Sequence, residues 1–200
     1  MAYVIGASGA LFFVLVFLID GLTRPGYSPV RHPVSALALG ARGWIQISNF
    51  VVSGAAITVG GVSIATAGRQ PLLGGMLAIF GLGLVASGFR MDPMRGYPPG
   101  TPEGDPADVT VYHKLHDYAG AVVFFSLPVT AAVAAFVLPE VAWKVLSAIA
   151  AAALMSASYA FGKAWERDSP RAGLIQRAFI IPGWLWVAAV FLRFGSQNAL

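Results

Sequence analysis

Six long apolar blocks with few charged residues constrain this chain more than any other feature. They cover residues 3–19, 44–67, 72–89, 112–138, 143–164 and 174–194. Each is close to the roughly 20 residues with which an α-helix crosses about 30 Å of hydrocarbon. A single soluble domain of this length has no core that could bury them all. We therefore predict an all-α, polytopic integral membrane protein in which residues 1–200 form one domain, a bundle of six transmembrane helices.

Composition and patterning exclude the other classes. Transmembrane β-strands are about 10 residues long and alternate apolar with polar side chains, a pattern that these blocks lack. Only 11% of the residues are charged, against roughly 25% in soluble domains. Because no Lys or Arg precedes Arg24, we expect the first block to be a retained span and not a signal peptide. The chain has no cysteine, so disulfides, thiolate metal sites and a catalytic cysteine are excluded.

Basic residues gather on one side of the predicted bundle. Loops one, three and five, with their helix ends, carry ten of the thirteen Lys and Arg: Arg24, Arg31, Arg42, Arg90, Arg95, Lys114, Lys163, Arg167, Arg171 and Arg177. The other side carries Arg69, Lys144 and Arg193. The positive-inside rule then predicts a cell-membrane protein with those three loops in the cytoplasm and both termini outside. The chain has no nucleic-acid motif, so the expected partners are membrane lipids; its oligomeric state is left open.

Small and aromatic residues indicate how the spans pack. Gly74 and Ala78, like Gly83 and Ser87, lie four residues apart and so share a helix face, which allows close approach between membrane helices. Tryptophan and tyrosine are enriched at membrane interfaces. Aromatic side chains near the predicted span ends are therefore expected to be mostly interface anchors: Trp44, Trp143, Trp184, Trp186 and Tyr118.

The most informative polar cluster opens the fourth span. His113, His116 and Asp117 are spaced three and four residues apart, so they share one helical face. Ionisable groups that enter a membrane helix are costly and usually face the bundle interior. Together with Asp92, after the third span, they are our candidate catalytic residues for acid/base chemistry. His113, His116 and Asp117 are also candidate ligands of a divalent metal. The alternatives are binding of an anionic head group, or a hydrogen-bonded cap on the helix.

Other candidates come from the same side of the membrane. Asp20 closes the first span. Gln46, Asn49 and Ser53 form a polar stripe that serves either hydrogen bonding between helices or a cavity lining. The candidate substrate-binding residues are Arg90, Arg177, Gln176, Asn49, Trp44 and His32. Arg90 and Arg177 would hold an anionic group. Taken together, these residues predict a polar pocket on the side of loops one, three and five, covered by the proline-rich loop 90–110.

Short motifs in a fixed order resemble one known family. They are 32–37 (HPVSAL), 43–44 (GW), 49–50 (NF), 88–92 (GFRMD), 113–117 (HKLHD) and 173–177 (GLIQR), followed by Trp184. Through these motifs and their order, the chain resembles the uncharacterised six-span membrane family catalogued as domain-of-unknown-function family 998. The resemblance implies a six-helix bundle and no established activity.

Two functional hypotheses follow. In the first, the protein binds or processes a lipid-like or isoprenoid-like amphipathic small molecule at the membrane interface, by acid/base or metal-assisted chemistry. In the second, it is a non-enzymatic small transporter or an accessory subunit. Transporters commonly show inverted repeats and polar sites at the midplane, whereas here the polar residues lie at one interface and no repeat is found. The first hypothesis is therefore favoured, and whether the protein is an enzyme is left open.

Overall fold

The computed structural model describes residues 1–68 and 70–197, and its regular structure there is helical. The elements are α1 (Ala2–Thr23), η1 (Val34–Ala38), α2 (Gly43–Thr66), α3 (Pro71–Ala86), α4 (Val111–Val137), α5 (Val141–Glu166) and α6 (Ala172–Gln197). Five of these α-helices are long and apolar enough to cross a membrane, and the sixth, α3, is a shorter apolar helix. The predicted class, a polytopic helical membrane bundle, is confirmed.

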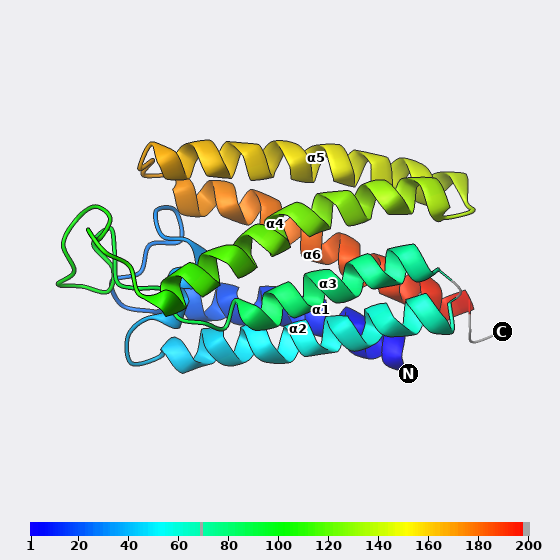
Figure 1. Cartoon of the computed structure of the whole chain (residues 1–200), viewed down its shortest axis with the longest axis horizontal. Helices are drawn as coiled ribbons and strands as arrows, with labels where there is room; N and C mark the ends of the chain where they lie inside the picture. Colours follow the sequence, from blue (N-terminus) through cyan, green and yellow to red (C-terminus); the bar gives the residue numbers. More distant parts are fainter. Residues whose placement is uncertain (69, 198–200) are drawn as a thin grey trace.

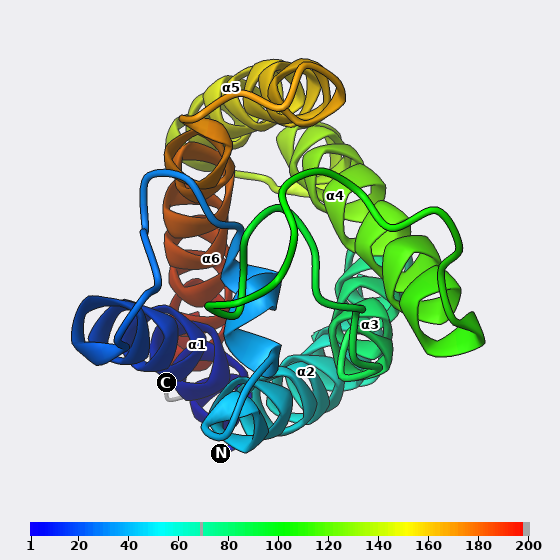
Figure 2. The same cartoon turned by 90° about the vertical axis from the view of Figure 1, so that its left-hand side faces the viewer.

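The six α-helices form a closed ring. Each packs against the next helix in the chain, and α6 closes the ring against α1 (Figure 2). The start of α1, the end of α6 and the turn between α4 and α5 lie at one end of the bundle, which we call the terminal end (Figure 1). The three longer connections lie at the opposite end, the loop end, where η1 and loop 90–110 cross the mouth of the ring. Arg69, predicted to be on the side of the termini, lies outside the described residues.

Glycines let α2 and α3 approach each other to backbone contact. A Cβ added at Gly74 would collide with the backbone nitrogen of Ala65, and one added at Gly54 would lie 2.6 Å from the carbonyl oxygen of Gly81. Membrane helices have little hydrophobic drive to associate, so such small faces supply much of their packing contact. The role predicted for Gly74 is confirmed.

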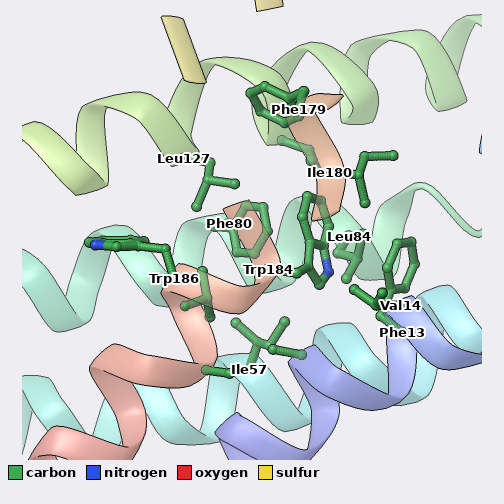
Figure 3. Close-up of a cluster of buried hydrophobic side chains, with 14 of the residues drawn as sticks. Phe13, Val14, Ile57, Phe80, Leu84, Leu127, Phe179, Ile180, Trp184 and Trp186 are labelled. Carbon is green, nitrogen blue, oxygen red and sulfur yellow. The ribbon is translucent and has the colours of Figure 1, made fainter. Parts of the chain in front are cut away.

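Aromatic side chains fill the middle of the ring (Figure 3). The indole of Trp184 stacks on Phe13 with 5.0 Å between ring centroids and meets Phe80 edge-on at 4.9 Å. Trp184 and Trp186 are both buried, so their prediction as interface anchors is wrong. They lie in the middle turns of α6, whose side chains turn mostly into the bundle. Trp44 and Tyr118 are 66% and 71% exposed, as anchors would be.

The third span ends earlier than predicted. α3 has 16 residues, a length of about 24 Å at 1.5 Å per residue. In Figure 1 it stops further from the loop end than its neighbours α2 and α4. At this end the Oγ and N–H of Ser87 both donate to the carbonyl of Gly83, and the chain then turns through Gly88. Residues 87–89 are apolar or small, so hydropathy alone did not mark this end.

Candidate functional site

A cavity of about 490 Å³ lies at the loop end of the ring. Three groups of elements line it: the first turns of α4, the ends of α5 and α6, and the irregular segments around η1 and loop 90–110. Its polar side chains are Ser35, Asp105, His113, His116, Asp117, Trp165 and Gln176, and its apolar ones include Met91, Met94, Phe124 and Phe161. We call this space the loop-end cavity. It brings together four of the predicted residues, His113, His116, Asp117 and Gln176.

The start of α4 is fixed by a cap that involves Asp92. Thr110 precedes the helix, and its Oγ1 accepts a hydrogen bond from the N–H of His113 at 3.3 Å. The carboxylate of Asp92 accepts from the N–H and Oγ1 of Thr110 at 2.7 and 2.9 Å. Burial raises the pKa of Asp92, but the two hydrogen bonds from Thr110 oppose this shift, and the pKa lies below its usual value. Asp92 does not line the cavity; it positions the helix that does.

His113 is held in one tautomer. Its Nδ1 accepts a hydrogen bond from the backbone N–H of Asp92 at 3.1 Å. A nitrogen that accepts carries no proton in the neutral ring, so the proton is on Nε2. That Nε2 lies 3.4 Å from Oδ2 of Asp117. Neutral His113 therefore presents an N–H beside a carboxylate at the cavity wall.

His116 is held in the opposite tautomer. Its Nδ1 lies 2.9 Å from the carbonyl oxygen of Ser87 and 2.8 Å from that of Phe89. Carbonyl oxygens only accept, so Nδ1 must carry the proton. The neutral ring then has its lone pair on Nε2, and both hydrogen bonds of the ring to the described residues are made by Nδ1. His113 and His116 thus line one cavity, one with a donor and the other with an acceptor.

The predicted metal ligands do not form a metal cluster in the part of the chain that the structure describes. No group of three or more His, Asp or Glu there is arranged to hold a metal ion. The Nδ1 atoms of both histidines are engaged with backbone groups. The divalent metal at His113, His116 and Asp117 therefore has no support from this geometry.

Arg177 lies away from the cavity and holds loop one. Its guanidinium donates to the carbonyl oxygens of Pro29 at 2.6 Å, His32 at 3.1 Å and Gly173 at 2.9 Å, and to the hydroxyl of Tyr27 at 2.6 Å. Burial raises the pKa of Tyr27 to about 12, although Arg177 opposes that shift. The side chain predicted to clamp an anion is therefore committed to the protein's own backbone.

His32 belongs to the same structure. Its Nδ1 accepts from the N–H of Ser28 at 3.0 Å, and its ring packs against those of Tyr27 and Tyr97, with centroids 5.4 and 5.0 Å away. Burial lowers the pKa of His32, and the nearby Arg31 and Arg177 lower it further. His32 contributes to the packing of loop one against loop 90–110 and does not line the loop-end cavity.

The remaining predicted residues also lie elsewhere. Asn49 donates to the carbonyl of Phe13 at 3.0 Å, so the polar stripe of α2 serves hydrogen bonding between helices. Buried Asp20 pairs with Arg24 and, at 2.6 Å, with Arg42. Arg90 is exposed and Trp44 mostly so, and neither lines the cavity.

An arginine clamp holds loop 90–110 over the cavity. Arg95 donates to Asp105 at 2.6 and 2.9 Å and to the carbonyl of Trp165 at 2.9 Å, and its guanidinium lies 3.8 Å from the centre of the Trp165 ring. Hydrogen bonding to Arg95 lowers the pKa of Asp105. The clamp ties the loop to the end of α5. Sequence reasoning missed Ser35, Asp105 and Trp165; Ser35 lies in the HPVSAL motif, but no local pattern marks the other two.

The ring of apolar helices defines a polytopic membrane protein with a cavity at one end. This chain belongs to the family described as "Protein of unknown function (DUF998)", whose model matches residues 7–193. The match confirms the resemblance seen in the short motifs. No curated protein and no solved structure matches the chain.

Proposed function

We propose that this protein binds a small amphipathic, lipid-like molecule in the loop-end cavity and that His113 and His116 act on it by acid/base chemistry. The observation that carries the proposal is the pair of opposite tautomers at one cavity wall. Neutral His116 offers the lone pair of Nε2, the form that a general base requires. Neutral His113 offers an N–H at Nε2, 3.4 Å from the carboxylate of Asp117, the form that can donate a hydrogen bond.

The mixed lining supports an amphipathic ligand. Ligand sites are mostly apolar with a few convergent polar groups that fix orientation. Here Phe124, Phe161 and the two methionines of loop 90–110 supply apolar surface, while the histidines and Gln176 supply polar atoms. A volume of about 490 Å³ is within the usual range for small-molecule sites.

The core below the cavity favours binding over transport. Trp184, Phe13 and Phe80 pack in ring contact across the middle of the bundle, between the loop end and the terminal end (Figure 3). Alternating access needs two halves of a protein to rock around a central site. Side chains packed in this way make such a movement costly.

Gly120 provides a direct test. It lines the loop-end cavity, and a Cβ added there has no heavy atom within 4 Å. Gly120→Leu should fill the cavity without displacing other residues. Gly162→Leu on exposed α5 is the matched control, because a Cβ there also meets nothing within 4 Å. We expect lipid extraction and mass spectrometry of purified protein to find an amphipathic molecule in the wild type and in Gly162→Leu, and to find it lost in Gly120→Leu. An equal amount of the bound molecule in the wild type and both variants would contradict the proposal.

We also propose that the loop end faces the cytoplasm of a cell membrane. The support is the excess of Lys and Arg at that end together with the positive-inside rule. Because the chain has no cysteine, one cysteine can be introduced at Gly104 in loop 90–110 and another, separately, at Glu140. A membrane-impermeant maleimide applied to intact cells should label Glu140→Cys and spare Gly104→Cys. The reverse pattern would invert the orientation.

A further inference from the structure

A second, smaller cavity continues from the loop-end cavity toward the core. It has a volume of about 50 Å³, and we call it the inner chamber. The two spaces share Ser35, His116, Gly120, Phe124 and Gln176, so these residues form the junction between them. Beyond the junction the inner chamber is lined mainly by apolar side chains and reaches Trp184.

The junction and the inner chamber contain polar atoms that the described residues leave unpaired. The Nε1–H of Trp184, a residue only 1% exposed, has no hydrogen-bond partner. Gln176 accepts from the N–H of Val34 at 2.7 Å through Oε1, and its amide nitrogen donates to no described residue. The Nε2 of His116 is an unused acceptor. Of these atoms, the Nε1 of Trp184 is buried as well as unpaired. Leaving such a group without a partner is costly, so this set indicates a site for a group from outside the protein.

The unpaired atoms include donors and an acceptor. Trp184 and Gln176 donate N–H, and neutral His116 accepts at Nε2. A group that satisfies both must accept and donate at once. A hydroxyl does so: its oxygen accepts from an N–H while its proton is donated to a nitrogen. A carbonyl, ether or phosphate dianion has no proton for His116.

The charges around the two cavities also favour a ligand without negative charge. Among the described residues, no Lys or Arg lines either space, while Asp105 and Asp117 line the outer one. Arg95 and Arg177, which lie nearby, are committed to Asp105 and to loop-one carbonyls. An anionic head group would therefore find no cation and would face the carboxylate of Asp117.

We propose that the ligand is a neutral amphipathic alcohol whose hydroxyl lies where the junction meets the inner chamber. There it donates to Nε2 of His116 and accepts from Gln176 at the junction or from Trp184 in the inner chamber. This rests on the proposed function and names its class of ligand. The apolar part of the molecule lies against the apolar side chains of the two spaces, and His116 is the base that the hydroxyl contacts.

The test compares three probes that share one isoprenoid chain: farnesol, farnesyl methyl ether and farnesyl monophosphate. Binding to detergent-purified wild type is measured by the quenching of tryptophan fluorescence. One hydrogen bond contributes about 1 kcal/mol net, so we expect farnesol to bind roughly fivefold more tightly than the ether or the phosphate. His116→Asn keeps an N–H for the carbonyls of Ser87 and Phe89 but removes Nε2, and it should abolish the preference for farnesol over the ether.

The outcomes separate the two proposals. Equal binding of farnesol and its ether, or tighter binding of the phosphate, overturns the alcohol assignment, as does a preference that survives in His116→Asn. An ordered water as the only occupant of the junction would give that equal binding. If Gly120→Leu still weakens all three probes and Gly162→Leu does not, the cavity remains a binding site for another class of ligand. If Gly120→Leu weakens none of them, the proposed function fails as well.

Discussion

His116 of α4 donates from Nδ1 to the carbonyl oxygens of Ser87 and Phe89, at 2.9 and 2.8 Å, where the chain leaves α3. Backbone groups at membrane depth have no water to pair with and must be satisfied by protein. One imidazole thus completes the end of a short helix and also lines the cavity. This side chain contributes both to the stability of the fold and to the proposed chemistry, and substitutions can separate the two contributions.

The first prediction concerns His116. His116→Leu leaves two carbonyls unpaired and should lower the free energy of unfolding by about 1–3 kcal/mol. His116→Asn keeps a donor near the position of Nδ1 and should lose much less. Thermal unfolding in detergent measures both. If the two variants unfold at the same temperature, the role of Nδ1 assigned here is wrong.

The second prediction compares two adjacent glycines of α3. A Cβ at Gly74 collides with the backbone of α2, whereas a Cβ at Gly75 meets nothing within 4 Å. Gly74→Ala should destabilise the protein by about 1–3 kcal/mol through overpacking. Gly75→Ala should be neutral or stabilising by up to about 1 kcal/mol, because alanine is the better helix former. Equal melting temperatures for the two variants would contradict the close α2–α3 contact.

The third prediction concerns Arg177. Its guanidinium reaches three carbonyls and the hydroxyl of Tyr27, a planar arrangement that a lysine ammonium cannot reproduce. Arg177→Lys should therefore expose loop one to faster proteolysis and lower the melting temperature despite the conserved charge. Tyr27→Phe removes one of these partners and also the donor to the carbonyl of Pro33, and it should cost about 1–3 kcal/mol. Resistance of Arg177→Lys to proteolysis equal to that of the wild type would show that charge alone suffices.

The fourth prediction concerns the pH dependence of loop one. The folded protein lowers the pKa of His32, chiefly by burial, with Arg31 and Arg177 adding to the effect and Glu103 opposing it. The unfolded chain, with a histidine pKa of about 6.5, then binds the proton more readily than the folded one. The contribution of neutral His32 to stability is fully present above a pH of about 6.5, the pKa in the unfolded chain. It is lost as the pH falls from there through the lower pKa of His32 in the folded protein.

His32→Asn isolates this contribution, because its Oδ1 can still accept from Ser28 but does not titrate. The variant should be less stable at pH 7.5, having lost the contacts with Tyr27 and Tyr97. Its melting temperature should also fall less than that of the wild type when the pH is lowered from 7.5 to 5.5. Identical losses over that interval would rule out His32 as the titrating group.

Much of the fold was predictable because lipid imposes simple rules on a chain. Spans had to be apolar and helical, and helical periodicity placed His113, His116 and Asp117 on one face, which does line the cavity. The end of α3 was not predictable, because hydropathy does not distinguish residues 87–89 from the helix before them. Trp184 was assigned wrongly to a span end, although residue 184 is the midpoint of the predicted span 174–194 and lies in the middle of α6.

The site was predicted only in part, because tertiary contacts decide what an arginine does. Arg177 and Arg95 carry the same charge in the sequence, yet one holds loop one and the other holds loop 90–110 against Trp165. Asp105 and Trp165 reach the cavity from elements far apart in the chain. Only the three-dimensional structure brings them beside His113.

The 16-residue length of α3 has a consequence for the surrounding membrane. At about 24 Å, this helix is shorter than the roughly 30 Å of hydrocarbon in a typical bilayer, and hydrophobic stretches of this kind are accommodated by local thinning. The leaflet beside α3 should therefore dip toward the polar segment that joins α3 to α4. Bilayer thickness would then act on the cavity from outside, and lipids with shorter acyl chains should relieve the mismatch at its rim.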